Sequence, residues 1–171
     1  MQARENLEIV RKYIIEKPST ERMMAEDSYT SSEIVQIYLA SPKGITRRIR
    51  SRRYGECTRY FETSKIRVDK MSSHEYEREI DREEFDRLSA EIAEGSRPIE
   101  KIRYTFDYKG QTFEIDVYPE WERTCVMETE LDSRDATPEI PDFIRILAEV
   151  TGDKRYSNAA MSRSFPEETK I

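Results

Sequence analysis

Charged side chains alternate with apolar ones throughout residues 100–132. Alternate residues of a β-strand point to the same face. Three consecutive strands here would therefore gather one charged set, made of Lys101, Arg103, Glu114, Asp116, Glu128, Glu130 and Asp132. Carboxylate oxygens suit a divalent cation, and the side chains of Lys and Arg suit phosphate. The pattern is compatible with a polyanion and metal site, and also with the solvated face of an antiparallel sheet.

The same alternation recurs on other predicted strands, and it carries charges of both signs. The further charged positions are Glu8, Lys12, Arg48, Arg50, Arg52, Lys65, Arg67, Glu75, Glu77 and Glu79. Arginines that face other arginines repel one another unless carboxylates or a bound anion lie between them. The recurrence therefore favours a shared polar interior over plain surface.

The elements that must position these side chains are mainly strands. We predict strands at residues 7–16, 34–39, 45–53 and 58–69, another at 75–80, and three within 100–132. The opposite face of the last three is apolar, and it is expected to pack against helices through Ile102, Phe113, Ile115, Val117 and Leu131.

Helical patterns separate some of these strands. Asp81–Glu94 has Asp81 as a predicted N-cap, and Ile140–Val150 has an apolar stripe at helical spacing. Shorter helices are predicted near residues 21–25 and 157–163. The fold class is therefore α+β and mainly antiparallel β, a closed or nearly closed barrel with a wet lumen and helices outside.

Composition sets the bounds on function. The chain has 171 residues, which suits a single domain 1–171 with a polar tail at about 165–171, and its formal net charge is −6. A negative net charge provides no long-range attraction for nucleic acid or an anionic membrane, so neither is an expected partner.

The N-terminus shows no signal-peptide pattern, and no apolar run has the length of a membrane span. Cys57 and Cys125 lack metal-type spacing and predict reduced thiols in a cytoplasmic protein. Oligomeric state is not predicted.

Several motifs in order resemble the CYTH-like, or triphosphate tunnel metalloenzyme, superfamily. They are Glu8-Ile9-Val10-Arg11-Lys12-Tyr13, Gln36-Ile37-Tyr38-Leu39, Arg48-Ile49-Arg50, Thr63-Ser64-Lys65, Glu75-Tyr76-Glu77, Lys101-Ile102-Arg103-Tyr104, Phe113-Glu114-Ile115-Asp116-Val117-Tyr118, Met127-Glu128-Thr129-Glu130, Glu149-Val150-Thr151-Gly152-Asp153 and Tyr156-Ser157-Asn158. The resemblance implies an eight-stranded antiparallel tunnel with helices packed outside. It also implies action on a triphosphate with Mg²⁺ or Mn²⁺, as in inorganic, thiamine and RNA triphosphatases and class IV adenylyl cyclases.

The resemblance also implies roles for single residues. Lys12, Arg48, Arg50, Lys65, Lys101 and Arg103 would hold phosphate oxygens, and the metal ligands would come from Glu8, Glu75, Glu77, Glu114, Asp116, Glu128 and Glu130. A second metal ion, or a free carboxylate such as Glu77 or Glu130, would activate the attacking water, and Lys12 would act beside them. Two positions depart from the family pattern. Val10 stands where the motif has its second Glu, and Ser73 stands where many relatives carry Arg.

The expected function is metal-dependent hydrolysis of inorganic triphosphate or a nucleoside triphosphate. A cyclase-like lyase and a binding module that has lost its metal chemistry stay open as alternatives. Three other residues have structural interpretations. His74 is expected to face away from Glu75, Trp121 to pack in a loop, and Asn158 to start or cap a helix. No Gly-rich phosphate loop is present, which excludes a P-loop mechanism.

Overall fold

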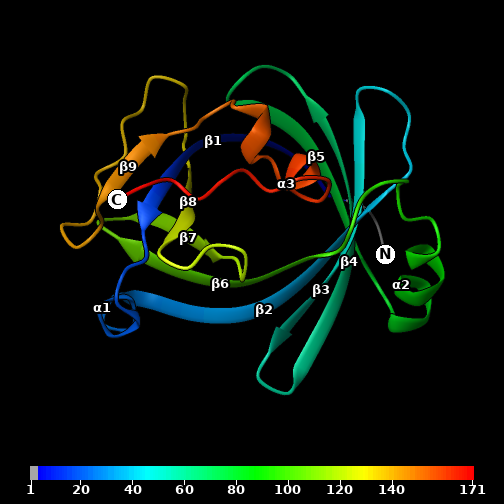
Figure 1. Cartoon of the computed structure of the whole chain (residues 1–171), viewed down its shortest axis with the longest axis horizontal. Helices are drawn as coiled ribbons and strands as arrows, with labels where there is room; N and C mark the ends of the chain where they lie inside the picture. Colours follow the sequence, from blue (N-terminus) through cyan, green and yellow to red (C-terminus); the bar gives the residue numbers. More distant parts are fainter. Residues whose placement is uncertain (1–3) are drawn as a thin grey trace.

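The computed structural model describes residues 4–171, so the first three residues of the N-terminus, where no targeting signal is predicted, lie outside it. The alternating segments form the strands β1 (Arg4–Glu16), β2 (Asp27–Leu39), β3 (Ile45–Tyr54), β4 (Cys57–Arg67), β5 (Ser72–Ile80), β6 (Ile99–Tyr108), β7 (Gln111–Val117), β8 (Thr124–Glu130) and β9 (Ile146–Glu149). Their order is β5-β4-β3-β2-β6-β7-β8-β1-β9. The β5–β1 pairing closes β1–β8 into the predicted antiparallel barrel (Figure 1).

The helices are short. They are α1 (Thr20–Met24), α2 (Arg82–Ser89), the 3-10 turn η1 (Lys154–Tyr156) and α3 (Asn158–Met161). The predicted cap of α2 is confirmed, because an Asp81 carboxylate oxygen accepts a 2.8 Å hydrogen bond from the backbone N–H of Glu84. The helix ends at Ser89 rather than at the predicted Glu94. Within residues 4–171, no helix has the length and apolar character needed to span a bilayer.

The helix predicted over Ile140–Val150 is wrong. This segment is a turn region that leads into β9, which pairs with Tyr13–Ile15 of β1. The physical reason lies in β1, whose edge is covered by β5 only as far as Ile9. Beyond that point the backbone groups of β1 need another partner, and β9 supplies it.

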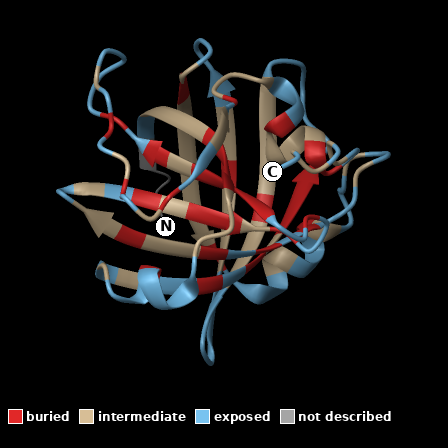
Figure 2. Cartoon of the chain, turned by 60° about the vertical axis from the view of Figure 1, so that its left-hand side comes forward, coloured by how far each residue is buried: buried red, intermediate tan, exposed pale blue. Residues whose placement is uncertain are grey.

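The apolar outer face of the barrel forms a core cluster around Phe106, Phe113, Ile115 and Met127, all fully buried. Buried segments lie mainly along the strands, and the outer loops are largely exposed (Figure 2). The expectation that helices cover this face is only partly right. The short helix α1 contributes Met23, and the loop before β9 contributes its own apolar residues, Ile140, Phe143 and Ile144. Ile102 does not pack against a helix as predicted, because its side chain is 39% exposed.

A second cluster closes one end of the barrel interior. Ile14 and Val126 continue the strand faces that carry Lys12 and Glu128, and they pack with Tyr118 and Trp121. The C-terminal residues cover this cluster and are not the loose polar tail that the sequence indicates. Phe165 packs edge-on against Tyr118 and Trp121. The packing role predicted for Trp121 is thus confirmed.

Candidate functional site

The polar faces of the strands meet in one cavity of about 910 Å³ inside the barrel. The predicted site residues that line it are Glu8, Lys12, Arg48, Arg50, Lys65, Glu75, Glu77, Arg103, Glu114 and Glu128. They come from strands far apart in the sequence, which the barrel closure brings together. The expectation of a shared polar interior is therefore confirmed. We call this cavity the tunnel.

Two arginines of β3 face two glutamates of β5 across the intervening strand β4. Arg48 lies 3.0 Å from Glu75, and Arg50 lies 3.2 Å from Glu77. The Nε atoms of Arg48 and Arg50 are buried without a hydrogen-bond partner. Buried donors normally have partners, so these two N–H groups suit an anion that enters the tunnel.

The β1 side of the tunnel repeats this arrangement. Lys12 lies 3.0 Å from Glu128, and Lys65 of β4 lies 3.6 Å from Glu8. Burial opposes ionisation of Glu128, but the neighbouring Lys12 lowers the pKa of its carboxyl to about 2. Burial, together with the hydrogen bond and the charge of Glu75, raises the pKa of Glu8 to about 8. Glu8 and Glu75 therefore form a carboxyl pair that can hold a shared proton.

Three predicted site residues do not line the tunnel. Asp116 is buried, and its oxygens accept hydrogen bonds from Arg103 at 2.7 and 2.9 Å and face the ammonium of Lys101 at 2.8 Å. Burial lowers the pKa of Lys101 to about 7 despite this pairing. Glu130 lies largely exposed at the end of β8, where partial desolvation and the charge of Glu114 raise the pKa of its carboxyl. Lys101 and Asp116 thus lie on the inner strand faces beyond the cavity, next to Ile99 and Tyr118 of the cluster that closes the barrel interior. Glu130 lies outside the residues that line the tunnel.

The donor set suits a hard divalent cation, because the tunnel offers several carboxylates at once. As the side chains stand, no three His, Cys, Asp or Glu residues within residues 4–171 converge on one point, since each tunnel carboxylate lies beside a cation or another carboxyl. Val10 lines the tunnel between Glu8 and Lys12, as the alternation predicts, and Ser73 lines it opposite Glu8.

Sequence reasoning missed the C-terminal contribution to the tunnel. The segment from Val150 to Ala159 forms part of its wall, and the ammonium of Lys12 donates a 3.1 Å hydrogen bond to the carbonyl of Tyr156. The motifs of this segment were visible in the sequence, but they carry few charges. Contacts between a loop and a barrel cannot be inferred from strand alternation.

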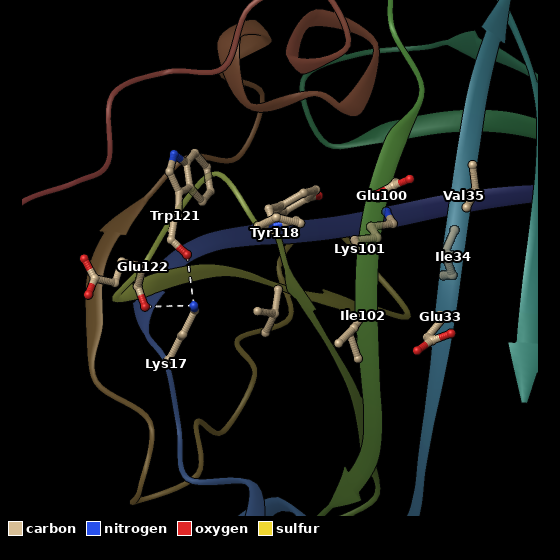
Figure 3. Close-up of a pocket in the computed structure, with 12 residues that line it drawn as sticks. Lys17, Glu33, Ile34, Val35, Glu100, Lys101, Ile102, Tyr118, Trp121 and Glu122 are labelled. Carbon is tan, nitrogen blue, oxygen red and sulfur yellow. Dashed lines mark hydrogen bonds between the residues drawn. The ribbon is translucent and has the colours of Figure 1, made fainter. Parts of the chain in front are cut away.

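A second cavity of about 600 Å³ lies between β2, β6 and the β7–β8 connection (Figure 3). Its lining is largely apolar and includes Val35, Ile102 and Val117. The ammonium of Lys17 donates to the backbone carbonyls of Trp121 and Glu122, at 2.9 and 2.8 Å. This cavity therefore lacks the concentration of cations that a polyanion needs.

Comparison with known proteins gives relatives of named activity, although no protein-family model matches the chain. An inorganic triphosphatase of Nitrosomonas europaea is 37% identical over 133 residues, which is 77% of this chain and 84% of that protein. An inorganic triphosphatase of Acetivibrio thermocellus is 38% identical over 96 residues, which is 55% of this chain and less than two thirds, 59%, of that protein. A crystal structure of an inorganic triphosphatase matches with a TM-score of 0.57 at 32% identity, over 93% of this chain and 96% of that chain.

Proposed function

Because this chain belongs to the inorganic triphosphatases of the CYTH superfamily, we propose that it hydrolyses inorganic triphosphate inside its tunnel with the help of a divalent cation. The observation that carries the proposal is the set of cation–carboxylate pairs around one cavity. The pairs are Arg48–Glu75, Arg50–Glu77, Lys12–Glu128, Lys65–Glu8 and Arg103–Glu114.

These pairs suit the exchange of partners that substrate binding would require. A triphosphate carries several negative charges close together, and the arginine forks bind phosphate oxygens bidentately. Phosphate oxygens would pair with the side-chain cations, and the released carboxylates could then bind the metal. Each buried cation and each carboxylate would thus keep a partner of opposite charge before and after binding, which avoids the large cost of an unpaired buried charge.

The metal set that we propose comes from the tunnel carboxylates Glu8, Glu75, Glu77, Glu114 and Glu128, with Glu130 nearby. Asp116 is left out because both of its oxygens already contact Arg103 or Lys101. Mg²⁺ or Mn²⁺, when bound there, would neutralise charge that develops on the phosphate oxygens.

Glu77 is the better candidate of the two carboxylates expected to activate water. Its Oε1 accepts hydrogen bonds from Arg50 and from the hydroxyl of Thr63, both at 3.2 Å. Its Oε2 has no hydrogen bond within residues 4–171, so this oxygen is available to orient a water and accept its proton. Glu130 is exposed and does not line the tunnel.

Arg48, Arg50, Lys65 and Arg103 would hold the phosphates, and Lys12 would add charge close to Glu128. Positioning and charge stabilisation supply most of the catalysis of phosphoryl transfer. The free thiols of Cys57 and Cys125 support a reducing compartment, the cytoplasm, as the site of this activity.

The test is the product pattern from tripolyphosphate and from ATP, each with Mg²⁺ or Mn²⁺. We expect phosphate and pyrophosphate from tripolyphosphate, and slower or no turnover of ATP. Cyclic AMP from ATP would replace the proposal with a lyase. Tight binding of tripolyphosphate without turnover under any metal would replace it with a binding module.

A further inference from the structure

We propose that Asn158 is a substrate-binding residue of the tunnel, and that its side-chain amide donates a hydrogen bond to an oxygen of the bound triphosphate. This inference rests on the proposed function and extends it, since Asn158 lies outside the charged strand faces. Its basis is the orientation in which two side chains, those of Tyr118 and Lys101, hold the carboxamide.

The place of Asn158 in the fold leaves its side chain free for such a role. Asn158 is the first residue of α3, and the cap of that helix is Ser157, whose hydroxyl accepts a 3.1 Å hydrogen bond from the N–H of Ala160. The capping role considered for Asn158 is therefore filled by its neighbour. Asn158 itself lines the tunnel.

Two donors fix the carboxamide oxygen. Oδ1 of Asn158 accepts a 2.8 Å hydrogen bond from the hydroxyl of Tyr118 and lies 3.4 Å from the ammonium of Lys101. An ammonium only donates hydrogen bonds, so the atom that faces it must be the oxygen and not the nitrogen of the amide. Tyr118 and Lys101 are themselves buried, at 1% and 4% exposure, and hold the amide in one orientation.

The nitrogen of the amide is consequently directed elsewhere. Nδ2 of Asn158 has no hydrogen-bond partner within residues 4–171, and it is not a buried atom, so it opens onto the cavity that the residue lines. A phosphate oxygen would satisfy this N–H group. The contact adds a hydrogen-bond donor to the tunnel without adding another positive charge. Positive charges already crowd the tunnel, because burial and the charges of Arg48 and Arg103 lower the pKa of Arg50.

Asn158→Asp separates substrate binding from structure, because the two effects have opposite signs. A carboxylate keeps the shape of the residue and the acceptor for Tyr118, and it gains an ion pair with Lys101. We therefore expect an unchanged or higher melting temperature. The donor is replaced by a negative charge, so we expect the dissociation constant for tripolyphosphate, measured by calorimetry in EDTA, to rise more than about tenfold.

Asn158→Ala should weaken the same binding about tenfold, since one hydrogen bond to a charged group is lost. Ser164→Asp is the charge-matched control, because Ser164 is exposed on the same segment and does not line the tunnel. We expect this control to bind like the wild type. When turnover of tripolyphosphate is measured with a metal present, the Asn158 variants should show a larger change in KM than in kcat.

Two results would overturn the inference. Wild-type affinity in both Asn158 variants would show that the amide does not contact the substrate, even if the melting temperature falls. A loss of affinity in Ser164→Asp as large as that in Asn158→Asp would show a general charge effect. If the wild type itself does not bind tripolyphosphate, the proposed function fails as well, and this outcome is distinct from the first two.

Discussion

Arg50 lies among other cations in the tunnel wall. Burial, followed by the charges of Arg48 and Arg103, lowers the pKa of its guanidinium to about 10, although Glu77 acts in the opposite direction. Its Nε also lacks a partner. A bound polyanion would therefore be a better partner for the guanidinium of Arg50 than the protein groups that surround it.

We predict that Arg50→Ala weakens tripolyphosphate binding about 10- to 100-fold, which corresponds to roughly 1.5–3 kcal/mol for a charge-assisted contact. The melting temperature should change little, because removal of Arg50 also removes repulsion. Calorimetry with tripolyphosphate and thermal melting measure the two effects. Arg53→Ala is the matched control, since Arg53 lies on the same strand but is exposed and pairs with Glu33. Equal affinity in Arg50→Ala and Arg53→Ala would contradict the role of Arg50.

Val10 tests how much of the acidic set the reaction needs. Its side chain lines the tunnel opposite Glu130 and cannot bind a cation. Since Glu75, Glu77 and other carboxylates remain in the tunnel, we predict that Val10→Glu changes the rate of phosphate release by less than about tenfold, or 1.4 kcal/mol of barrier. Titrations with Mg²⁺ and Mn²⁺ should show a modest change in metal preference. An inactive wild type that Val10→Glu activates would be the opposite outcome.

Asp116 and Glu130 were expected to act alike, as metal ligands, yet the structure separates them. We predict that Asp116→Asn lowers the free energy of unfolding by about 3–5 kcal/mol, because it leaves Lys101 buried without its counter-charge and leaves Arg103 with Glu114 alone. Glu130→Gln at an exposed position should lower it by less than about 0.5 kcal/mol. Urea denaturation measures both. Similar, small losses in the two variants would show that Asp116 does not hold this pair.

These residues show what the sequence can and cannot predict at a site. Alternation correctly assigned Glu77, Glu114 and Asp116 to the inner face of the barrel. It could not tell how deep along the barrel axis each one lies, because depth depends on strand register and tilt. Asp116 is consequently buried beyond the cavity at the closed end of the barrel interior, and Glu130 is exposed.

At the scale of elements, strands were predicted more reliably than the segments that cover them. Strand alternation is a local property, so β3, β4 and β5 lie close to their predicted bounds. The residues of β9 have helical spacing of their apolar side chains, but they pair with β1 because the edge of β1 lacks another partner there. The spacing of apolar residues in one segment does not show that a strand distant in the sequence has unpaired backbone hydrogen-bonding groups.

The C-terminal segment is anchored by Glu168. Its carboxylate accepts hydrogen bonds from the backbone N–H groups of Glu122, Arg123 and Thr124 and from the hydroxyl of Thr124. Burial opposes ionisation, but these hydrogen bonds lower the pKa of the Glu168 carboxyl. Glu168 therefore holds the segment that brings Tyr156 and Asn158 to the tunnel.

We predict that Glu168→Gln lowers the free energy of unfolding by about 1–2 kcal/mol at pH 7. Since the folded pKa of Glu168 lies below its ordinary value of 4.5, its contribution is complete above that value and is lost as the pH falls through the folded pKa. The difference between wild type and variant should therefore shrink below about pH 4.5. Urea denaturation at pH 7 and pH 3 measures it. A difference that grows toward pH 3 would contradict the assignment.

At the scale of the whole molecule, barrel closure converts scattered charges into one site. The β5–β1 pairing brings Glu75 and Glu77 to the same cavity as Glu8, Lys12 and Glu128. The net charge of −6 would not attract a polyanion from a distance. Substrate recognition must therefore depend on the local cations of the tunnel, which is why its geometry matters more than the overall charge.

The most direct test of the tunnel as the substrate site is a crystal structure of the protein with tripolyphosphate in EDTA, where turnover is prevented. We predict phosphate density inside the barrel within hydrogen-bond distance of Arg48, Arg50 and Arg103, with their carboxylate partners displaced. Density beside Lys17 in the apolar cavity, or on the outer surface with the pairs Arg48–Glu75 and Arg50–Glu77 intact, would contradict it.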